Sequence, residues 1–267
     1  MNNVFFILRT LVQLHLPIIK NTVLFQSFMG QYNDNPKYIS EKLHIRHPDV
    51  RIVWAIKDGK RETFPAYVDL VHISSKEYAK FAARAEVVVD NYSGCRTFFV
   101  TKRNILKRIV FKLISRHRRG QFNISTWHGT PLKHISLDEP IYRNAKFAKA
   151  YVSTDVLIAG CDLTANAFRT ALMWNNPIWL CGTPRNDLLF ENDKIELKKK
   201  LGLPLDKKVI LFAPTFRESI EMSGIYQLKE INVERLLAIL SNKFGGDWCF
   251  VFRSHNLVMA RIQDIGL

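Results

Sequence analysis

One histidine stands where proteins with parallel sheets commonly carry out chemistry. His128 lies in the segment WHGTPLK, directly after the apolar run FNISTW at 122–127. An imidazole near its ordinary pKa can take a proton from a hydroxyl group or give one to a leaving oxygen. A lone histidine is more often structural, so the neighbouring residues must decide between the two interpretations.

The Gly-Thr-Pro sequence after His128 recurs in CGTPRND at 181–187. Each copy follows a predicted strand, and its threonine and proline suit the N-cap and first position of a helix. A helix start presents free N–H groups and a positive dipole end, which favour phosphate. Ordinary capped helices are the alternative, but the second copy and the histidine favour an anion site. The candidate phosphate-binding residues here are Gly129, Thr130, Lys133, Thr183 and Arg185.

Two further polar clusters follow predicted strands later in the chain. APTFR supplies Thr215 and Arg217, and FRSHN supplies Arg253 and His255. Arginine can clamp phosphate oxygens with two donors at once. Residues two apart in a strand face the same side, which places Arg253 beside His255. For His255 a structural role is again the alternative.

A parallel sheet would bring these clusters to one edge, and the chain has the pattern of such a fold. Short apolar runs alternate with helical patterns such as NPKYISEKLHIRH and NVERLLAILSNKF. Runs that are apolar throughout suit parallel strands covered on both faces, and the alternation predicts an α/β fold. Ligands bind beyond the carboxyl ends of such strands. The predicted strands lie at 50–56, 85–90, 122–127, 155–160, 177–182, 208–215 and 247–253.

A polar, charged segment at 183–207 predicts a boundary between two domains. We expect an N-terminal domain at 1–182 and a C-terminal domain at 183–267. After the linker the second domain has only a strand, a helix and a strand, about 60 residues, which is short for a domain of this class. It is therefore expected to be partial.

The composition narrows the classes of partner. The chain has 267 residues and a formal net charge of +15, which implies attraction to nucleic acid, an acidic membrane surface or a phosphorylated substrate. The four cysteines form no CxxC pair, so a reducing compartment fits better than a disulfide framework or a zinc site. The apolar N-terminus has no uninterrupted run of the roughly 20 residues that span a bilayer, and it lacks the features of a signal peptide.

A basic segment at 101–120 carries eight Lys or Arg residues and no acid. Its residues Leu106, Ile109, Val110 and Leu113 fall on one helical face. This pattern is typical of a helix lying on an anionic membrane. A basic face packed on the core and a nucleic-acid contact are the alternatives. The candidate membrane-surface residues are Lys102, Arg103, Lys107, Arg108 and Lys112.

Together these segments resemble the CDP-glycerol glycerophosphotransferase family, the teichoic acid primases and polymerases of the TagB and TagF type. The resemblance covers about residues 24–259, through FQSFMGQYNDNPKYISEKL, PDVRIVWAIKD, EYAKFAARAEVVVDN, TWHGTPLK, CGTPRNDLL, FAPTFR and FRSHN in the family's order. Asn256 stands where the family usually has proline, and the basic insert at 101–119 looks longer than the family's usual link. Family members continue for roughly a hundred more residues, with a serine-rich segment.

The resemblance implies a GT-B-like architecture of two Rossmann-like domains, with acceptor and membrane on the N-terminal side and the nucleotide donor on the C-terminal side. The implied reaction moves glycerol phosphate, or a related polyol phosphate, from a CDP-linked donor to a hydroxyl of a polyprenyl-linked or polymer acceptor. It belongs to teichoic acid or capsule-type polymer synthesis, at the cytoplasmic face of the bacterial membrane, with the protein peripheral. No cofactor is expected, and substrate phosphates would hold any divalent metal ion.

The resemblance also implies the catalytic residues. His128 would be the general base on the acceptor hydroxyl, and His255, with Arg253 and Arg217, would bind or protonate the leaving phosphate side. Nucleic acid is not an expected partner of such an enzyme. Two alternatives stay open: a nucleotide-sugar glycosyltransferase of the same architecture, and a truncated, non-catalytic module that binds a membrane surface or nucleic acid.

Overall fold

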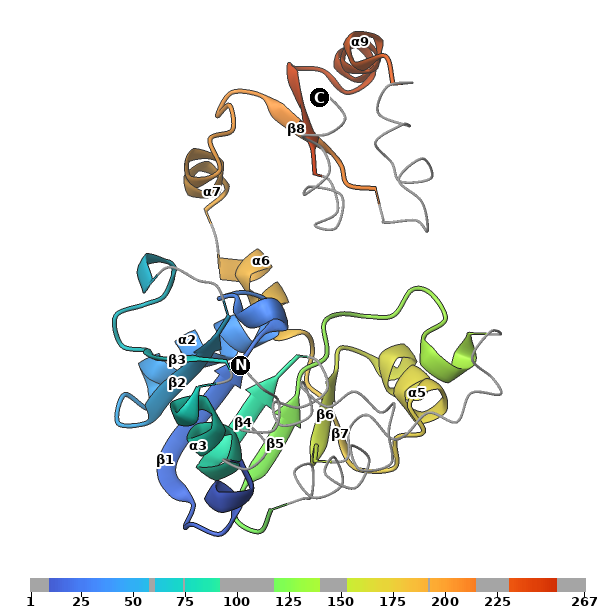
Figure 1. The fold of residues 1–267 in the computed structure, drawn as a ribbon. Helices are drawn as coiled ribbons and strands as arrows, with labels where there is room; N and C mark the ends of the chain where they lie inside the picture. Colours follow the sequence, from blue (N-terminus) through green and yellow to red (C-terminus); the bar gives the residue numbers. More distant parts are fainter. Residues whose placement is uncertain are drawn as a thin grey trace, which may run out of the picture. The chain divides into compact units, whose positions relative to one another are not determined.

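The computed structural model describes residues 10–57, 61–73, 75–91, 118–139, 153–191, 193–214 and 231–253. The chain divides into two compact units, Met1–Phe190 and Glu191–Leu267. This division falls inside the linker predicted at 183–207. Figure 1 shows the elements of each unit in chain order.

Unit 1 is built on a parallel sheet of seven strands (Figure 1). The strands are β1 (Ile19–Gln26), β2 (Arg51–Ile56), β3 (Asp69–His72), β4 (Ala85–Asp90), β5 (Phe122–Ser125), β6 (Val156–Ala159) and β7 (Ile178–Leu180). Their order is β3-β2-β1-β4-β5-β6-β7. The chain builds outward from β1 on one side and from β4 on the other. The switch point of the fold therefore lies between β1 and β4, where open α/β sheets bind ligands.

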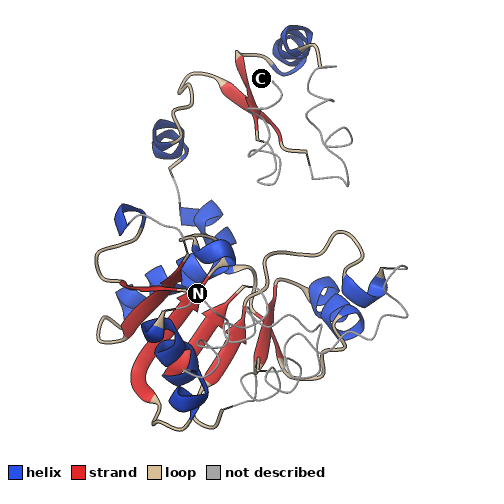
Figure 2. Ribbon diagram, in the orientation of Figure 1, coloured by secondary structure: helices blue, strands red, loops and turns tan. Residues whose placement is uncertain are grey.

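Helices cover both faces of this sheet (Figure 2). The described α-helices of the unit include α2 (Asp34–Arg46), α3 (Lys76–Arg84), α5 (Asp162–Ala171) and α6 (Leu188–Glu191), the last residue of which belongs to unit 2. The 3-10 helices are η1 (Phe28–Gly30), η2 (Arg61–Thr63), η3 (Ser136–Asp138) and η5 (Pro184–Asp187).

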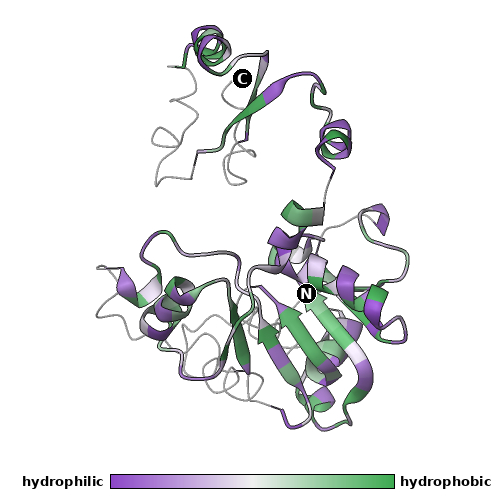
Figure 3. Cartoon of the chain, turned by 180° about the vertical axis from the view of Figure 1, so that it is seen from behind, coloured by the Kyte–Doolittle hydropathy of each residue, from purple (hydrophilic) through white to green (hydrophobic). Residues whose placement is uncertain are grey.

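Alternate side chains of the central strands build two separate cores. Leu24 of β1 packs in a cluster with Tyr78 of α3, whereas its neighbour Phe25 packs in a second cluster with Trp54 and with Ile39 of α2. Because both faces of the sheet are buried, the interior of the central strands is mostly apolar, and Figure 3 shows these strands largely in green.

Unit 2 contains α7 (Lys194–Lys200), β8 (Lys208–Phe212), α9 (Val233–Phe244) and β9 (Trp248–Phe252). β8 and β9 pair in parallel. Asn232 caps α9, and its side chain accepts a hydrogen bond from Arg235 N at 2.9 Å. Among the residues of this unit that the structure describes, none is fully buried.

The predicted α/β fold with a parallel sheet is confirmed, as are the seven predicted strands and the helices at α2 and α9. The sequence pattern misses β1 and β3. In β1 three polar residues follow Ile19, and one of them, Asn21, with φ of 53°, lies where the register with β4 shifts. β3 is a four-residue edge strand in which only Val71 is buried. Neither strand therefore carries the long apolar run that marks β2, β6 and β8.

The candidate membrane-surface residues at 102–112 lie outside the described residues. Arg118, near the end of the basic segment, donates to Gln13 O at 3.0 Å and to the carbonyl groups of Ala83 and Leu16. Burial, together with the nearby Arg84, lowers the pKa of Arg118. No helix in the described part of the chain is long and apolar enough to cross a membrane. The membrane-surface role of the segment stays a prediction.

Candidate active site

Polar residues gather at the carboxyl edge of the seven-stranded sheet, next to the switch point. Ser27 follows β1, Asn91 follows β4 and His128 comes three residues after β5. Asn91 Nδ2 donates to Ser27 Oγ at 3.1 Å, which ties the ends of the two central strands together. His128 therefore lies at the edge where a ligand site is expected.

The imidazole of His128 is exposed and fixed at one nitrogen. Its Nδ1 lies 3.2 Å from Asn91 O. Because a carbonyl oxygen only accepts, Nδ1 is the donor in this bond and carries a proton. In the neutral ring Nε2 is then an acceptor, which is what a general base needs. The ring also stacks on Trp127, with centroids 4.3 Å apart, and Trp127 contacts the buried Phe168 of α5 edge-on at 5.3 Å.

The predicted residues Gly129 and Arg185 meet beside His128. Arg185 Nη1 donates to His128 O at 3.0 Å and pairs with Asp34 Oδ1 at 2.5 Å. Gly129 has φ of 139°, and a Cβ there would lie 2.9 Å from Arg185 Nη2. Glycine therefore permits both the turn and the approach of the guanidinium group.

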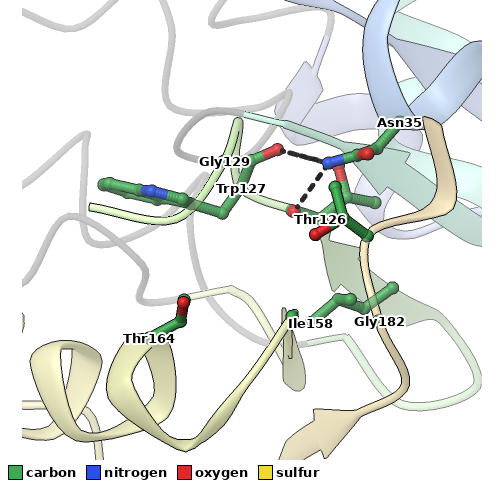
Figure 4. A pocket seen from close by; sticks show the side chains of 9 residues that line it. Asn35, Thr126, Trp127, Gly129, Ile158, Thr164 and Gly182 are labelled. Carbon is green, nitrogen blue, oxygen red and sulfur yellow. Dashed lines mark hydrogen bonds between the residues drawn. The ribbon is translucent and has the colours of Figure 1, made fainter. Parts of the chain in front are cut away.

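The two Gly-Thr-Pro copies also come together, around Gly160 at the end of β6. A Cβ on Gly160 would lie 2.6 Å from Thr183 Oγ1 and 3.8 Å from Thr130 Oγ1. Figure 4 shows the pocket beside them, which Asn35 and Trp127 also line. Its volume of about 10 Å³ is room for about one water molecule.

The helix expected after Thr130 is absent, so that part of the interpretation is wrong. Residues 130–135 have no regular secondary structure, and η3 begins only at Ser136. The cap signal is local, and no apolar helical repeat follows it. Instead the segment packs on α5, where Thr170 Oγ1 donates to Asp138 Oδ2 at 2.7 Å. Thr183 does precede a helix, the short η5 with Pro184 at its start. Phosphate binding by both threonines stays a prediction.

Lys133 lines a second pocket, whose lining does not include His128. This lateral pocket, of about 450 Å³, lies between residues 131–138 and one face of α5. Its lining includes Leu132, Lys133, His134, Leu163, Asn166 and Thr170. Leu132 is 90% exposed and Leu163 62% exposed, so the pocket offers apolar surface beside a cation. Its lining begins at Pro131, three residues after His128. Three residues of extended chain span at most about 11 Å, so Pro131 lies within that distance of His128.

Of the candidate residues in unit 2, the structure describes Arg253 alone. Arg253 N donates to Phe212 O at 3.0 Å, and its side chain is exposed just after β9. Thr215, Arg217 and His255 lie outside the described residues, so their roles stay predictions.

Three residues of the site, Asp34, Asn35 and Asn91, are missing from the sequence-based candidates. Asn91 directly follows the predicted strand at 85–90, so the rule that selected His128 also selects it. Asp34 and Asn35 begin α2, and their place at this edge depends on β1, which the pattern misses.

Comparison with known proteins identifies the family of the chain. Residues 8–266 match the family model of CDP-glycerol:poly(glycerophosphate) glycerophosphotransferase. A teichoic acid poly(glycerol phosphate) polymerase of Staphylococcus epidermidis is 31% identical over 253 residues, covering 89% of this chain and 32% of that protein. A teichoic acid glycerol-phosphate transferase of Staphylococcus aureus is 30% identical over 263 residues, covering 92% of this chain and 62% of that protein.

Solved structures of the wall teichoic acid polymerase TagF share the GT-B-like fold. One matches with a TM-score of 0.71 and 28% identity, covering 91% of this chain and 58% of that one. Another, a histidine-to-asparagine variant soaked with CDPG, matches with a TM-score of 0.70 and 29% identity, over the same shares of both chains. The chain thus spans between about a third and about two thirds of the length of these relatives. It belongs to the CDP-glycerol:poly(glycerophosphate) glycerophosphotransferase family.

Proposed function

We propose that this protein transfers glycerol phosphate, or a related polyol phosphate, from a CDP-linked donor to a hydroxyl group of a growing acceptor in teichoic acid synthesis. The observation that carries the proposal is the state of His128. Its Nδ1 is bound to Asn91 O and its exposed ring leaves Nε2 as an acceptor, at the carboxyl edge of the sheet. Membership of the family supplies the reaction class.

In the proposed reaction His128 Nε2 takes the proton of the acceptor hydroxyl. The hydroxyl oxygen forms a bond to the glycerol-linked phosphorus of the donor, and the bond from that phosphorus to the oxygen of CMP breaks. CMP leaves with the electron pair of that bond. A positioned base of this kind contributes about 10²- to 10⁴-fold to the rate.

The lateral pocket suits the acceptor. Its lining begins at Pro131, three residues after His128, and Lys133 supplies a positive charge for a phosphate of the acceptor chain. Asn166 and Thr170 supply polar groups for polyol hydroxyls, while the exposed Leu132 and Leu163 offer apolar surface. The mixture fits a chain of alternating phosphates and polyols better than a purely apolar ligand.

The donor side is assigned to the second unit. Arg253, Arg217 and Thr215 would bind the phosphates of the donor, and His255 would bind or protonate the leaving group. The described residues hold no group of three or more His, Cys, Asp or Glu side chains placed to bind a metal ion. A divalent ion, if the reaction uses one, would be held mainly through the substrate phosphates.

We also assign the protein to the cytoplasmic face of the membrane, where a lipid-linked acceptor would lie. The basic segment at 101–119 and the net charge of +15 support this placement. Flotation with anionic and neutral liposomes tests it. Binding to the anionic vesicles that weakens with added salt is expected, and RNA binding of equal strength would contradict it.

A donor panel tests the proposed reaction. The chain is incubated with an acceptor and labelled CDP-glycerol, CDP-ribitol or a nucleotide sugar, and product and released CMP are measured. Transfer of a polyol phosphate with release of CMP supports the proposal, and sugar transfer would support the glycosyltransferase instead. In the acceptor arm Lys133→Ala is expected to raise the acceptor KM about tenfold with little change in kcat, because it removes uniform binding.

A further inference from the structure

The backbone around His128 is held in a conformation that it would not adopt alone. Trp127 has φ of 52° and Gly129 has φ of 139°, so both neighbours of the histidine lie at positive φ. A bulky residue such as tryptophan rarely occupies that region. Such strain persists only where surrounding groups determine the conformation. The side chains that supply this restraint come from outside the loop.

Three successive carbonyl groups of the loop accept hydrogen bonds from two side chains. Asn35 Nδ2 donates to Thr126 O at 3.2 Å and to Trp127 O at 3.3 Å, as the dashed lines of Figure 4 show. Arg185 Nη1 donates to His128 O at 3.0 Å. Asn35 is 1% exposed, and its amide oxygen accepts from Arg185 N at 3.2 Å. One buried amide therefore binds both the loop and the residue that holds the loop's next carbonyl.

Asp34 closes these contacts into a ring. Its Oδ1 pairs with Arg185 Nη1 at 2.5 Å, and its Oδ2 accepts from Asn91 Nδ2 at 2.6 Å. Asn91 O is the group that accepts from His128 Nδ1. The contacts thus run from Asp34 through Arg185 to the backbone of His128, and from its imidazole through Asn91 back to Asp34.

The backbone conformation of Asp34 indicates that the surrounding contacts hold this residue in one position. It is the first residue of α2, yet its φ is 57°, which costs about 1 kcal/mol or more. Its side chain is only 13% exposed, whereas that of Arg185 is 39% exposed, so water weakens this ion pair only in part.

We propose that Asp34 and Asn35 are positioning residues for the His128 base. Asn35 sets the backbone of the loop, and Asp34 holds the two groups that bind the histidine, Arg185 and Asn91. Together they keep the proton on Nδ1 and leave Nε2 to accept. The inference rests on the proposed function for its catalytic consequence, but the state of the imidazole can be measured without any reaction.

The matched control lies at the opposite edge of the same sheet. Gln121, 3% exposed, donates from Nε2 to Ala82 O at 3.3 Å and to Ala85 O at 2.9 Å. It therefore makes the same kind of contact as Asn35, a buried amide on two carbonyl groups, without any contact to His128. Asn35→Asp and Gln121→Glu each replace the donating NH₂ by an oxygen of similar size and are expected to lower stability similarly.

The experiment reads the tautomer of His128 by nitrogen-15 NMR in the whole chain, with the signal assigned by its loss in His128→Gln. The Nδ1–H form is expected in the unchanged protein and in Gln121→Glu. Asn35→Asp and Asp34→Asn are expected to show a mixture of both forms. The proposal is overturned if both variants keep the unchanged pattern, or if Gln121→Glu shifts it equally.

Transfer kinetics provide the second measurement. Asn35→Asp is expected to lower kcat about 10- to 100-fold with the donor KM within about twofold, because the base is misplaced while binding persists. Gln121→Glu is expected to keep kcat per folded molecule. If Asn35→Asp does not fold, Arg185→Lys replaces it, since lysine keeps the charge but not the planar guanidinium group whose Nη1 binds both Asp34 and His128 O. Absence of transfer in the unchanged protein would count against the proposed function, and the tautomer would still decide the positioning role.

Discussion

The carboxyl and amino edges of the seven-stranded sheet contain the same kind of hydrogen bond, from side chains to backbone carbonyl groups. They differ in what these hydrogen bonds support. At the carboxyl edge Asn35 and Arg185 donate to the carbonyl groups of the His128 loop. At the amino edge Gln121 and Arg118 donate to backbone carbonyl groups around α3 and the start of β1. Parallel strands leave backbone groups unpaired at both ends, and buried ones must be satisfied.

The difference lies in what each network leaves accessible. The carboxyl network surrounds an exposed imidazole whose second nitrogen can accept a proton. The described amino network surrounds backbone carbonyl groups and the guanidinium of Arg118. A buried hydrogen-bond network therefore does not by itself indicate a functional site. A functional site is indicated when the network orients a titratable group and leaves that group accessible to a ligand.

The two arginines should give the largest contrast in stability. Arg118→Ala leaves three carbonyl groups without their donor and is expected to lower the free energy of unfolding by about 2–4 kcal/mol. Arg185→Ala breaks a partly exposed pair and is expected to cost about 1 kcal/mol. Urea midpoints measure both. Transfer per folded molecule should show the reverse order, and a larger loss of stability in Arg185→Ala would contradict the comparison.

Alanine variants of two glycines, Gly129 and Gly120, distinguish the effect of backbone strain on stability from an effect on transfer. Gly129 has φ of 139° and Gly120 has φ of 83°, so alanine at either is expected to cost about 1–2 kcal/mol. A Cβ at Gly129 also meets Arg185 Nη2 at 2.9 Å, whereas at Gly120 it meets Ile18 Cγ1 at 3.4 Å. Because both glycines lie at positive φ, thermal melts should show similar decreases of the melting temperature for the two alanine variants. Transfer should fall in Gly129→Ala alone, and equal activity in the two variants would argue against Arg185 as a support of the loop.

Two cysteines at the carboxyl edge, Cys161 and Cys181, are expected to differ in reactivity. Hydrogen bonds from the Thr164 hydroxyl and from backbone N–H groups at the start of α5 lower the pKa of Cys161. Cys181 keeps accessible surface, but desolvation by the surrounding protein raises its pKa. Since the thiolate is the nucleophile, iodoacetamide should modify Cys161 at a lower pH than Cys181. Peptide mass spectrometry across a pH series measures this, and the opposite order would show that the α5 start does not favour negative charge.

The smallest effect is expected at the exposed ion pair of the amino edge. Lys20 Nζ lies 2.8 Å from Glu86 Oε1, and the Lys20 hydrogen bond followed by the Asn21 N–H lowers the pKa of Glu86. A lowered folded pKa stabilises the protein above the unfolded pKa, and this contribution disappears as the pH falls through the folded value. Glu86→Gln should therefore cost less than about 1 kcal/mol at pH 7, and nothing at a pH below the folded pKa. A cost that persists in acid would rule out this ionic origin.

The sequence predicts the parts of the molecule that depend on local patterns. β6 is apolar throughout and β2 is apolar after Arg51, and α2 and α9 have helical repeats. β1 has a polar first half, and its place in the centre of the sheet comes from pairing with β2 and β4. The helix after Thr130 was predicted from a three-residue cap, which the packing against α5 overrides.

The same division holds for the site. His128, Gly129 and Arg185 stand in short motifs and can be found by the rule that ligands bind at the ends of strands. Asp34 is 151 positions from Arg185, and its role appears only when β1 places the start of α2 beside the ends of β4, β5 and β7. The proposed base could thus be predicted from the sequence, whereas Asp34 and Asn35, the residues proposed to position it, required the fold.

The most direct test of the central claim compares two exposed histidines at the carboxyl edge. His72, at the end of β3, also has Nδ1 on a backbone carbonyl, Ile73 O at 2.7 Å, but three strands, β2, β1 and β4, lie between β3 and β5 in the sheet. The measurement is kcat for polyol phosphate transfer by His128→Gln and His72→Gln. We predict a loss of about 10²- to 10⁴-fold for His128→Gln, with an unchanged melting temperature, and a change within about twofold for His72→Gln. Near-wild-type transfer by folded His128→Gln would contradict the account.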